Sequence, residues 1–106
     1  MIEPRFNALI HSPVRLRICS LLRHASELEF ATIRDTLDVT DAHLSKNLKL
    51  LSDTEIVQLR KDPSGSSARK RTWAALTKEG RGTVDAHLAA LTQLAAGDVT
   101  IPGLDR

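Results

Sequence analysis

Leucines at helical spacing mark the middle of the chain. In the segment 41–51, DAHLSKNLKLL, Leu44, Leu48 and Leu51 are four and three residues apart, so they lie on one face of an α-helix. The positions between them carry imidazole, hydroxyl, amide and ammonium groups. The pattern predicts a helix with a buried leucine edge and a solvent-facing polar face that can donate hydrogen bonds.

Two helical patterns lie near the N-terminus. Residues 4–10, PRFNALI, begin with a proline that suits a first helical turn and place three apolar side chains on one side. Ser12 and Pro13 then provide an N-cap and a first-turn residue for a largely apolar helix over residues 14–25. We therefore expect a short N-terminal helix followed by a helix that is mostly core.

A further helix directly precedes the leucine-lined one. After an extended piece that starts at Phe30, Ile33 and Leu37 are spaced i, i+4 and predict about two helical turns. Asp38 is expected to end this helix, and Thr40 is placed to cap the next one. Two helices joined by so short a connection form a helix-turn-helix.

The segment after these helices alternates in the manner of β-strands. Residues 56–61, IVQLRK, and 71–77, RTWAALT, place apolar and polar side chains in turn. Between them lie residues 62–70, DPSGSSARK, whose proline, glycine and serines favour a loop. A β-hairpin with a long basic tip follows from this order.

The last third of the chain predicts one more helix. Thr77 can cap it, an apolar face runs through residues 81–96, and Gly97 ends it before a loose tail over 97–106. No internal repeat or long linker divides the sequence. We expect a single domain over residues 1–106 that is mainly α-helical with one small β-hairpin.

Positive charge is concentrated in one part of the sequence. Residues 46–71 hold seven Lys and Arg against three Asp and Glu, a net charge of +4, whereas the remaining residues sum to −2. A basic segment on an otherwise slightly acidic domain is typical of a surface that meets phosphates. For any one of these residues, solvation of an exposed surface is the simpler alternative.

The segments LEFATIRDTLDVTDAHLSKNLKLLSDTEIV and ARKRTWAALTKEGR resemble the DNA-binding core of MarR/ArsR-type bacterial and archaeal transcriptional regulators. The resemblance is strongest to the small MarR-like group and covers residues 13–95. It implies a winged helix-turn-helix in which the leucine-lined helix is the recognition helix and the hairpin is the wing. The "LT…EG" corner, Leu76, Thr77, Glu79 and Gly80, would open the terminal helix.

The resemblance also implies which side chains would contact DNA. On the recognition helix they are Thr40, Ala42, His43, Ser45, Lys46, Asn47 and Lys49, and on the wing they are Ser66, Arg69, Lys70 and Arg71. The chemistry agrees, because an amide pairs with adenine and an ammonium donates to guanine O6 and N7 in the major groove. Arginines of a wing can follow the phosphates or enter a narrow minor groove. Arg71 has an alternative role in bracing its strand.

Two positions depart from the family's pattern. Glu55 stands where the family usually has glycine before the first wing strand, and Asp38 replaces a frequent glycine in the turn. Aspartate adopts the left-handed conformation with little difficulty, whereas glutamate there is strained.

We expect a homodimer formed by the terminal segments, 1–10 and 81–96. Apolar side chains form one strip in each segment: Phe6, Leu9 and Ile10 in the first, and Val84, Leu88, Leu91 and Ala95 in the second. A two-fold axis would bury both strips and place two recognition helices about 34 Å apart on a palindromic operator. The alternative is that the two strips pack on each other within one subunit.

Several classes of function are disfavoured. Cys19 is the only cysteine, so it forms no intramolecular disulfide, and in an apolar helix it is expected to be a buried hydrophobic residue rather than a redox sensor. The four histidines are scattered, which disfavours a metal site, and no pattern points to a cofactor. Neither a glycine-rich phosphate loop nor a catalytic signature is present, so we do not expect an enzyme.

The sequence has no apolar run of about 20 residues and no signal-peptide pattern, so we expect a cytoplasmic protein without a membrane partner. The leading hypothesis is a homodimeric, sequence-specific regulator of transcription that binds double-stranded DNA and acts as a repressor; the residues leave open whether it has a small-molecule effector. The alternative is a winged-helix protein–protein interaction module that does not bind DNA. The basic wing favours the first hypothesis, because docking surfaces more often present apolar residues.

Overall fold

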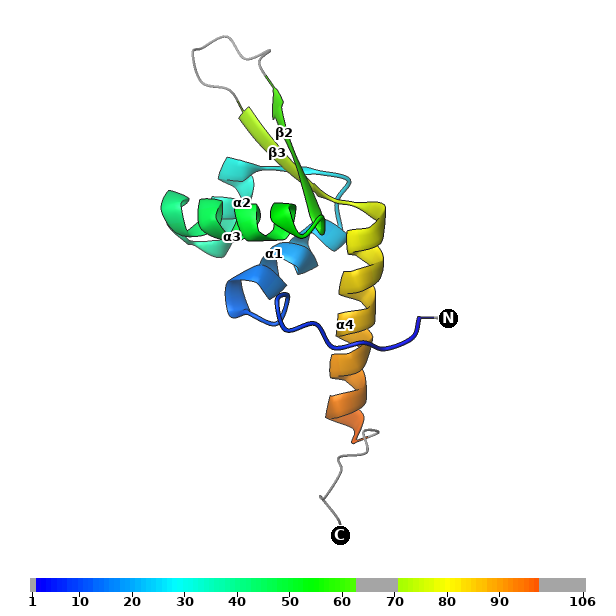
Figure 1. Ribbon diagram of the computed structural model, residues 1–106. Helices are drawn as coiled ribbons and strands as arrows, with labels where there is room; N and C mark the ends of the chain where they lie inside the picture. Colours follow the sequence, from blue (N-terminus) through cyan, green and yellow to red (C-terminus); the bar gives the residue numbers. More distant parts are fainter. Residues whose placement is uncertain (1, 63–70, 98–106) are drawn as a thin grey trace.

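The computed structural model describes residues 2–62 and 71–97, which form four helices and three short strands (Figure 1). In chain order they are α1 (Pro13–Arg23), β1 (Leu28–Glu29), α2 (Phe30–Leu37), α3 (Asp41–Asp53), β2 (Val57–Asp62), β3 (Arg71–Leu76) and α4 (Lys78–Ala96). This is the predicted winged helix, with α2 and α3 as the helix-turn-helix and β2 and β3 as the wing.

The core lies where α1, α2 and α3 meet the base of the sheet. The leucine edge of α3 is buried as predicted, since Leu44, Leu48 and Leu51 are at most 2% exposed. They pack in one cluster with Ile18 and Leu22 of α1 and with the inward side chains of the other elements. Burial of these side chains is the main favourable term that holds the helices together.

Side-chain caps mark where α3 and α4 begin, whereas Ser12, the predicted cap of α1, makes no side-chain cap hydrogen bond. The hydroxyls of Thr40 and Thr77 accept hydrogen bonds from the third residue of α3 and α4, at 3.1 and 2.8 Å. Gly97, at φ 76°, ends α4 in the left-handed conformation. Asp38 ends α2 at φ 55°, and Glu55 has φ 62°, so both departures from glycine carry a positive φ as expected.

The sheet has three antiparallel strands in the order β1-β3-β2. Val57 pairs with Leu76 at the base of the wing, and Asp62 pairs with Arg71 at its outer end. The third strand, β1, was not predicted as such: the extended piece is Leu28–Glu29, and Phe30 already begins α2. Leu28 and Glu29 pair with Ala74 and Trp73, which ties the wing to the helix-turn-helix.

A tight corner joins the wing to α4. Thr77 donates its hydroxyl to Glu55 O at 2.7 Å, and its backbone N–H donates to Ile56 O at 3.1 Å. A Cβ atom at Gly80 would lie 2.0 Å from Ile56 O, so only glycine permits this approach. The "LT…EG" sequence therefore closes the corner through two hydrogen bonds and one backbone contact.

The predicted N-terminal helix over residues 4–10 is wrong. Residues 2–7 have no regular structure and cross α4, where Arg5 N donates to Ala86 O at 2.9 Å, and residues 8–11 form a turn (Figure 1). Asn7 holds this turn, because its side-chain Oδ1 accepts from Ile10 N at 2.9 Å. A segment this short gains more from these contacts to the rest of the fold than from an isolated helical turn.

Candidate nucleic-acid interface

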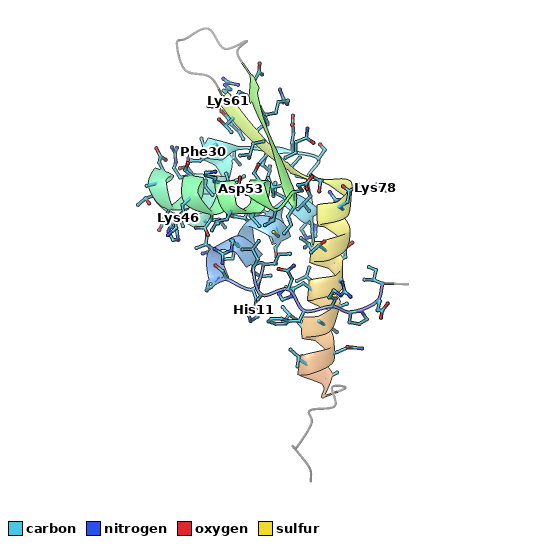
Figure 2. The ribbon with its side chains drawn as sticks, in the orientation of Figure 1. His11, Phe30, Lys46, Asp53, Lys61 and Lys78 are labelled. Atoms are coloured by element: carbon cyan, nitrogen blue, oxygen red, sulfur yellow. The ribbon has the colours of Figure 1, made fainter. Side chains whose placement is uncertain are left out.

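One face of α3 is polar and open to solvent. Its exposed side chains are those of Ala42, His43, Ser45, Lys46 and Lys49. Figure 2 shows Lys46 on this helix, away from the core. The leucine edge fixes which residues point outward, because side chains at i, i+3 and i+4 share a face.

An ion pair between Arg34 and Asp41 joins α2 to the N-terminus of α3. Arg34 donates to Asp35 at 2.9 Å and to Asp41 at 3.0 Å. Hydrogen bonds to both carboxylates raise the pKa of Arg34, so it remains charged. An unpaired Asp41 would repel a phosphate, and this pairing offsets its charge at the helix end that favours anions.

Asn47 differs from the prediction that it contacts a base. Its side chain is only 4% exposed. Its Oδ1 accepts from Arg15 Nη1 at 2.7 Å, and its Nδ2 donates to His43 O at 2.8 Å. Both ends of the amide are therefore engaged inside the protein, and the bidentate edge that adenine requires is not available in this conformation.

A cleft of about 370 Å³ separates α3 from the wing. Its walls combine hydroxyls, two lysines, one carboxylate and apolar side chains, from Phe30, Ser45, Leu48, Lys49, Ser52, Asp53, Leu59, Lys61 and Thr72. Figure 2 labels Phe30, Asp53 and Lys61 around it. Lys49 bonds to Asp53 at 3.1 Å, but both side chains are more than half exposed, so this pair restrains Lys49 only weakly.

Lys61 was not among the residues predicted to contact DNA. Strand alternation could have identified it, because Val57, Leu59 and Lys61 share one face of β2 and Val57 is buried. That face turns Lys61 toward the cleft rather than away from α3.

The structure describes only one of the four predicted wing residues. Arg71 is exposed and lies 3.7 Å from the half-buried Glu29 of β1, which fits the alternative role of bracing the strand. Ser66, Arg69 and Lys70 lie outside the described residues. Contact between these three side chains and DNA stays a prediction.

The outer face of the sheet is covered by charged side chains. Arg60 donates to Glu27 at 2.6 Å and lies over the Trp73 ring, 5.6 Å from its centroid. Trp73 Nε1 is buried without a hydrogen-bond partner among the residues described. With its ring under Arg60, Trp73 packs within the sheet and is not a free platform for stacking a base.

Comparison with known proteins identifies the fold family. The model of a family described as a winged helix DNA-binding domain matches residues 14–95, which is most of the chain. The chain belongs to the winged helix DNA-binding domain family. A curated relative from Methanocaldococcus jannaschii, itself uncharacterized, is 29% identical over 86 residues, which span 81% of this chain and 91% of that protein.

Solved structures place this winged helix domain beside MarR-family and related transcriptional regulators. A transcriptional regulator homologue from Pyrococcus horikoshii is 25% identical, with a TM-score of 0.76 over 87% of this chain and 89% of that one. Diamide-treated YodB from Bacillus subtilis superposes with a TM-score of 0.71 over 90% and 89% of the two chains. At 21% identity, the second match shows the fold alone. The resemblance inferred from the sequence is confirmed.

Burial within one subunit corrects two residues of the predicted dimer surface. Ile10 and Val84 are fully buried in the core of the winged helix domain and have no surface left for a partner. Leu9 and Leu88 are partly buried and pack against the same core. For these four residues, the alternative therefore applies: the two strips pack on each other within one subunit.

The outer ends of the two strips remain open. Phe6 is 49% exposed. The centroid of its ring lies 4.8 Å from that of His11 and 4.9 Å from that of His87. On α4, Ala95 is exposed, Leu91 is half-buried, and Leu94, which was not predicted, is 48% exposed.

No three His, Cys, Asp or Glu side chains within residues 2–62 and 71–97 are arranged to hold a metal ion. In the same residues, no helix has the length and apolar character needed to cross a membrane.

Proposed function

We propose that this chain is a homodimeric transcriptional regulator that binds a palindromic duplex operator and represses by occupying a promoter. In this proposal α3 enters the major groove, and Ala42, His43, Ser45 and Lys46 face the bases. Lys49 and Lys61, on the two sides of the cleft, hold the phosphate backbone between α3 and the wing. Arg69, Lys70 and Ser66 extend that contact along the wing.

One observation carries the proposal more than any other. The polar face of α3 is exposed beside a cleft lined by two lysines, three hydroxyl side chains and one carboxylate, Asp53, which is paired with Lys49. Base-edge contacts need an exposed helix face that fits the major groove, and phosphates need cations and hydrogen-bond donors beside it. The match to transcriptional regulators supports the same function.

A pool of random duplexes, selected for binding and sequenced, tests whether the protein prefers a sequence. The Lys46→Ala variant is expected to lose part of that preference, because a base-edge contact contributes about 1–3 kcal/mol of discrimination. The Lys61→Ala variant is expected to bind all duplexes more weakly and to lower the salt slope by about one unit.

Lys78 offers a matched control, since its substitution by alanine removes the same charge at the exposed start of α4 (Figure 2). Lys78→Ala should retain both the preference and the salt slope. Binding that is insensitive to salt and to Lys46 and Lys61 would favour the alternative function, a winged-helix module that docks on another protein.

The dimer is proposed to form through the C-terminal half of α4. In Figure 1 this half extends beyond the packed helices, with the N-terminal segment crossing the helix above it. Leu91, Leu94 and Ala95 would meet their symmetry mates there, and Phe6 would lie at the edge. A single recognition helix contacts too few base pairs for useful selectivity. A second subunit would double that number.

A further inference from the structure

A chain of hydrogen bonds links the recognition helix to the N-terminal turn. Arg15 of α1 stands at its centre and donates in two directions. Its Nη1 donates to Asn47 Oδ1 of α3 at 2.7 Å, and its Nε donates to Leu9 O in the turn at 2.6 Å. Asn47 is in turn bonded to the backbone of α3, because its Nδ2 donates to His43 O at 2.8 Å.

The turn is itself fixed to α4. Asn7 N donates to His87 Nδ1 at 2.9 Å, and His11 N donates to Asn7 O at 3.1 Å. His87 is fully buried. The position of α4 is therefore connected to the backbone of α3 through Asn7, Leu9, Arg15 and Asn47.

These hydrogen bonds restrict the orientation of α3 on α1 in a way that the contacts of the leucine edge do not. Apolar contacts are not directional, so Leu44, Leu48 and Leu51 alone would tolerate a small rotation or slide of α3 on α1. A buried amide that loses its partners is costly, and a guanidinium presents its donors in a rigid planar fork. Arg15 and Asn47 together therefore favour one orientation of α3.

We propose that Arg15 and Asn47 are positioning residues for the recognition helix: without touching DNA, they set the orientation in which His43 and Lys46 meet the bases. The inference rests on the proposed function of α3. It gives Asn47 an indirect part in specificity instead of the direct contact that its sequence position suggested.

The test compares Arg15→Met, Asn47→Leu and the double variant, which replace the polar pair by apolar side chains of similar length. Each single variant is expected to bind the selected operator about tenfold more weakly, the loss expected for one hydrogen bond to a charged group. Binding to random duplex should change by less than about twofold, because phosphate contacts tolerate a small rotation. The double variant should bind no more weakly than either single variant, since both remove the same link.

Arg17 provides the control on the same helix. Its side chain is exposed and contacts only Leu37 O, at 3.5 Å, among the hydrogen bonds of the described residues. Arg17→Met should leave the ratio of operator to random affinity unchanged. A purely structural effect of Arg15→Met would lower both affinities together with the melting temperature, which overturns the proposal, as would additive losses in the double variant.

Amide hydrogen exchange tests the same inference without DNA. In both single variants, exchange should rise in residues 44–51 of α3, whose N–H groups are hydrogen-bonded within the helix, more than in β2 and β3. If Asn47→Leu fails to fold, Arg15→Met alone decides through this measurement. Unchanged exchange in α3 would overturn the positioning role, whereas a wild-type protein that does not discriminate between duplexes would overturn only the proposed function.

Discussion

Single side chains in this winged helix take their roles from partners that are distant in sequence. The spacing of leucines correctly assigns the faces of α3, yet Asn47 lies inside the protein because Arg15, 32 positions earlier, reaches its amide. His11 and His87 are 76 positions apart in the sequence, yet His11 Nδ1 lies 3.2 Å from His87 Nε2. Local patterns cannot predict such pairs, since they depend on how the helices and the N-terminal segment pack.

Stability is expected to fall in mild acid because of His87. A backbone N–H can only donate, so the bond from Asn7 N requires His87 Nδ1 to be unprotonated. Burial, with a smaller effect from neighbouring His11, lowers the pKa of His87 below its ordinary 6.5. The unfolded chain therefore takes up a proton at higher pH than the folded protein does. Neutral His87 therefore contributes to the free energy of unfolding in full above pH 6.5. This contribution is lost as the pH falls from 6.5 to the lowered pKa of His87 in the folded protein.

Urea unfolding between pH 7.5 and 5 measures this dependence. The His87→Asn variant, which can keep an acceptor near the place of Nδ1, should show a smaller decrease over that range. His24 is exposed at the end of α1, so His24→Asn should retain the wild-type decrease. A wild-type stability that does not change below pH 6.5 would contradict the role of His87.

The Cys19 thiol is expected to be inert in the folded protein. It is fully buried, and burial raises its pKa to about 12, so that at pH 8 roughly one thiol in ten thousand is ionised. Reaction with a chromogenic disulfide should therefore be slow in buffer and complete within the mixing time in 6 M guanidinium, roughly the concentration that unfolds most domains. A native thiol that reacts at once would restore the redox-sensor role that the sequence disfavours.

At the scale of elements, the sequence predicts most of the fold because the boundaries are encoded locally. Thr40 and Thr77 cap the helices that they precede, and Gly97 ends α4. One strand was missed and one helix was wrongly predicted, because these segments are determined by contacts with distant parts of the chain. Strand β1 has two residues and exists only through its pairing with β3, and the segment 4–10 is shaped by α4 rather than by its own helical preference.

The corner between the wing and α4 gives a sharp test at this scale. Gly80→Ala would force a Cβ atom against Ile56 O, and backbone cannot rotate away as a side chain can, so we expect a loss of about 2 kcal/mol or more. Gly82 lies two residues further along the same helix, and a Cβ atom added there would meet nothing within 4 Å. Gly82→Ala should therefore stabilise the protein by about 0.5–1 kcal/mol. Urea denaturation of both variants decides, and equal effects of the two alanines would contradict this account.

For the molecule as a whole, the described Lys and Arg residues of the basic segment 46–71 lie on α3 and the wing. Asp53 partly offsets the charge of Lys49, and Glu27 and Glu29 do the same for Arg60 and Arg71. Composition alone could not separate the roles of neighbouring charges. On β2, Arg60 and Lys61 occupy opposite faces, because successive side chains of a strand point to opposite sides of the sheet.

The dimer is the remaining question at this scale, and burial decides which residues can test it. Leu88 packs against the core, so a charge there would unfold the subunit and reveal nothing about association. Leu91 is half-buried and Leu94 is 48% exposed near the end of α4, so these two positions can carry a charge without disturbing the core.

We expect the double variant Leu91→Glu, Leu94→Glu to remain folded but to sediment as a monomer, because two like charges would face their symmetry mates across the axis. It should bind a single half-site as the wild type does and lose the additional affinity for a palindrome. Gln93→Glu, an exposed change on the same turn, serves as the control for added charge. A wild-type protein that is monomeric at micromolar concentration and binds one half-site with full affinity would show that α4 does not form the interface.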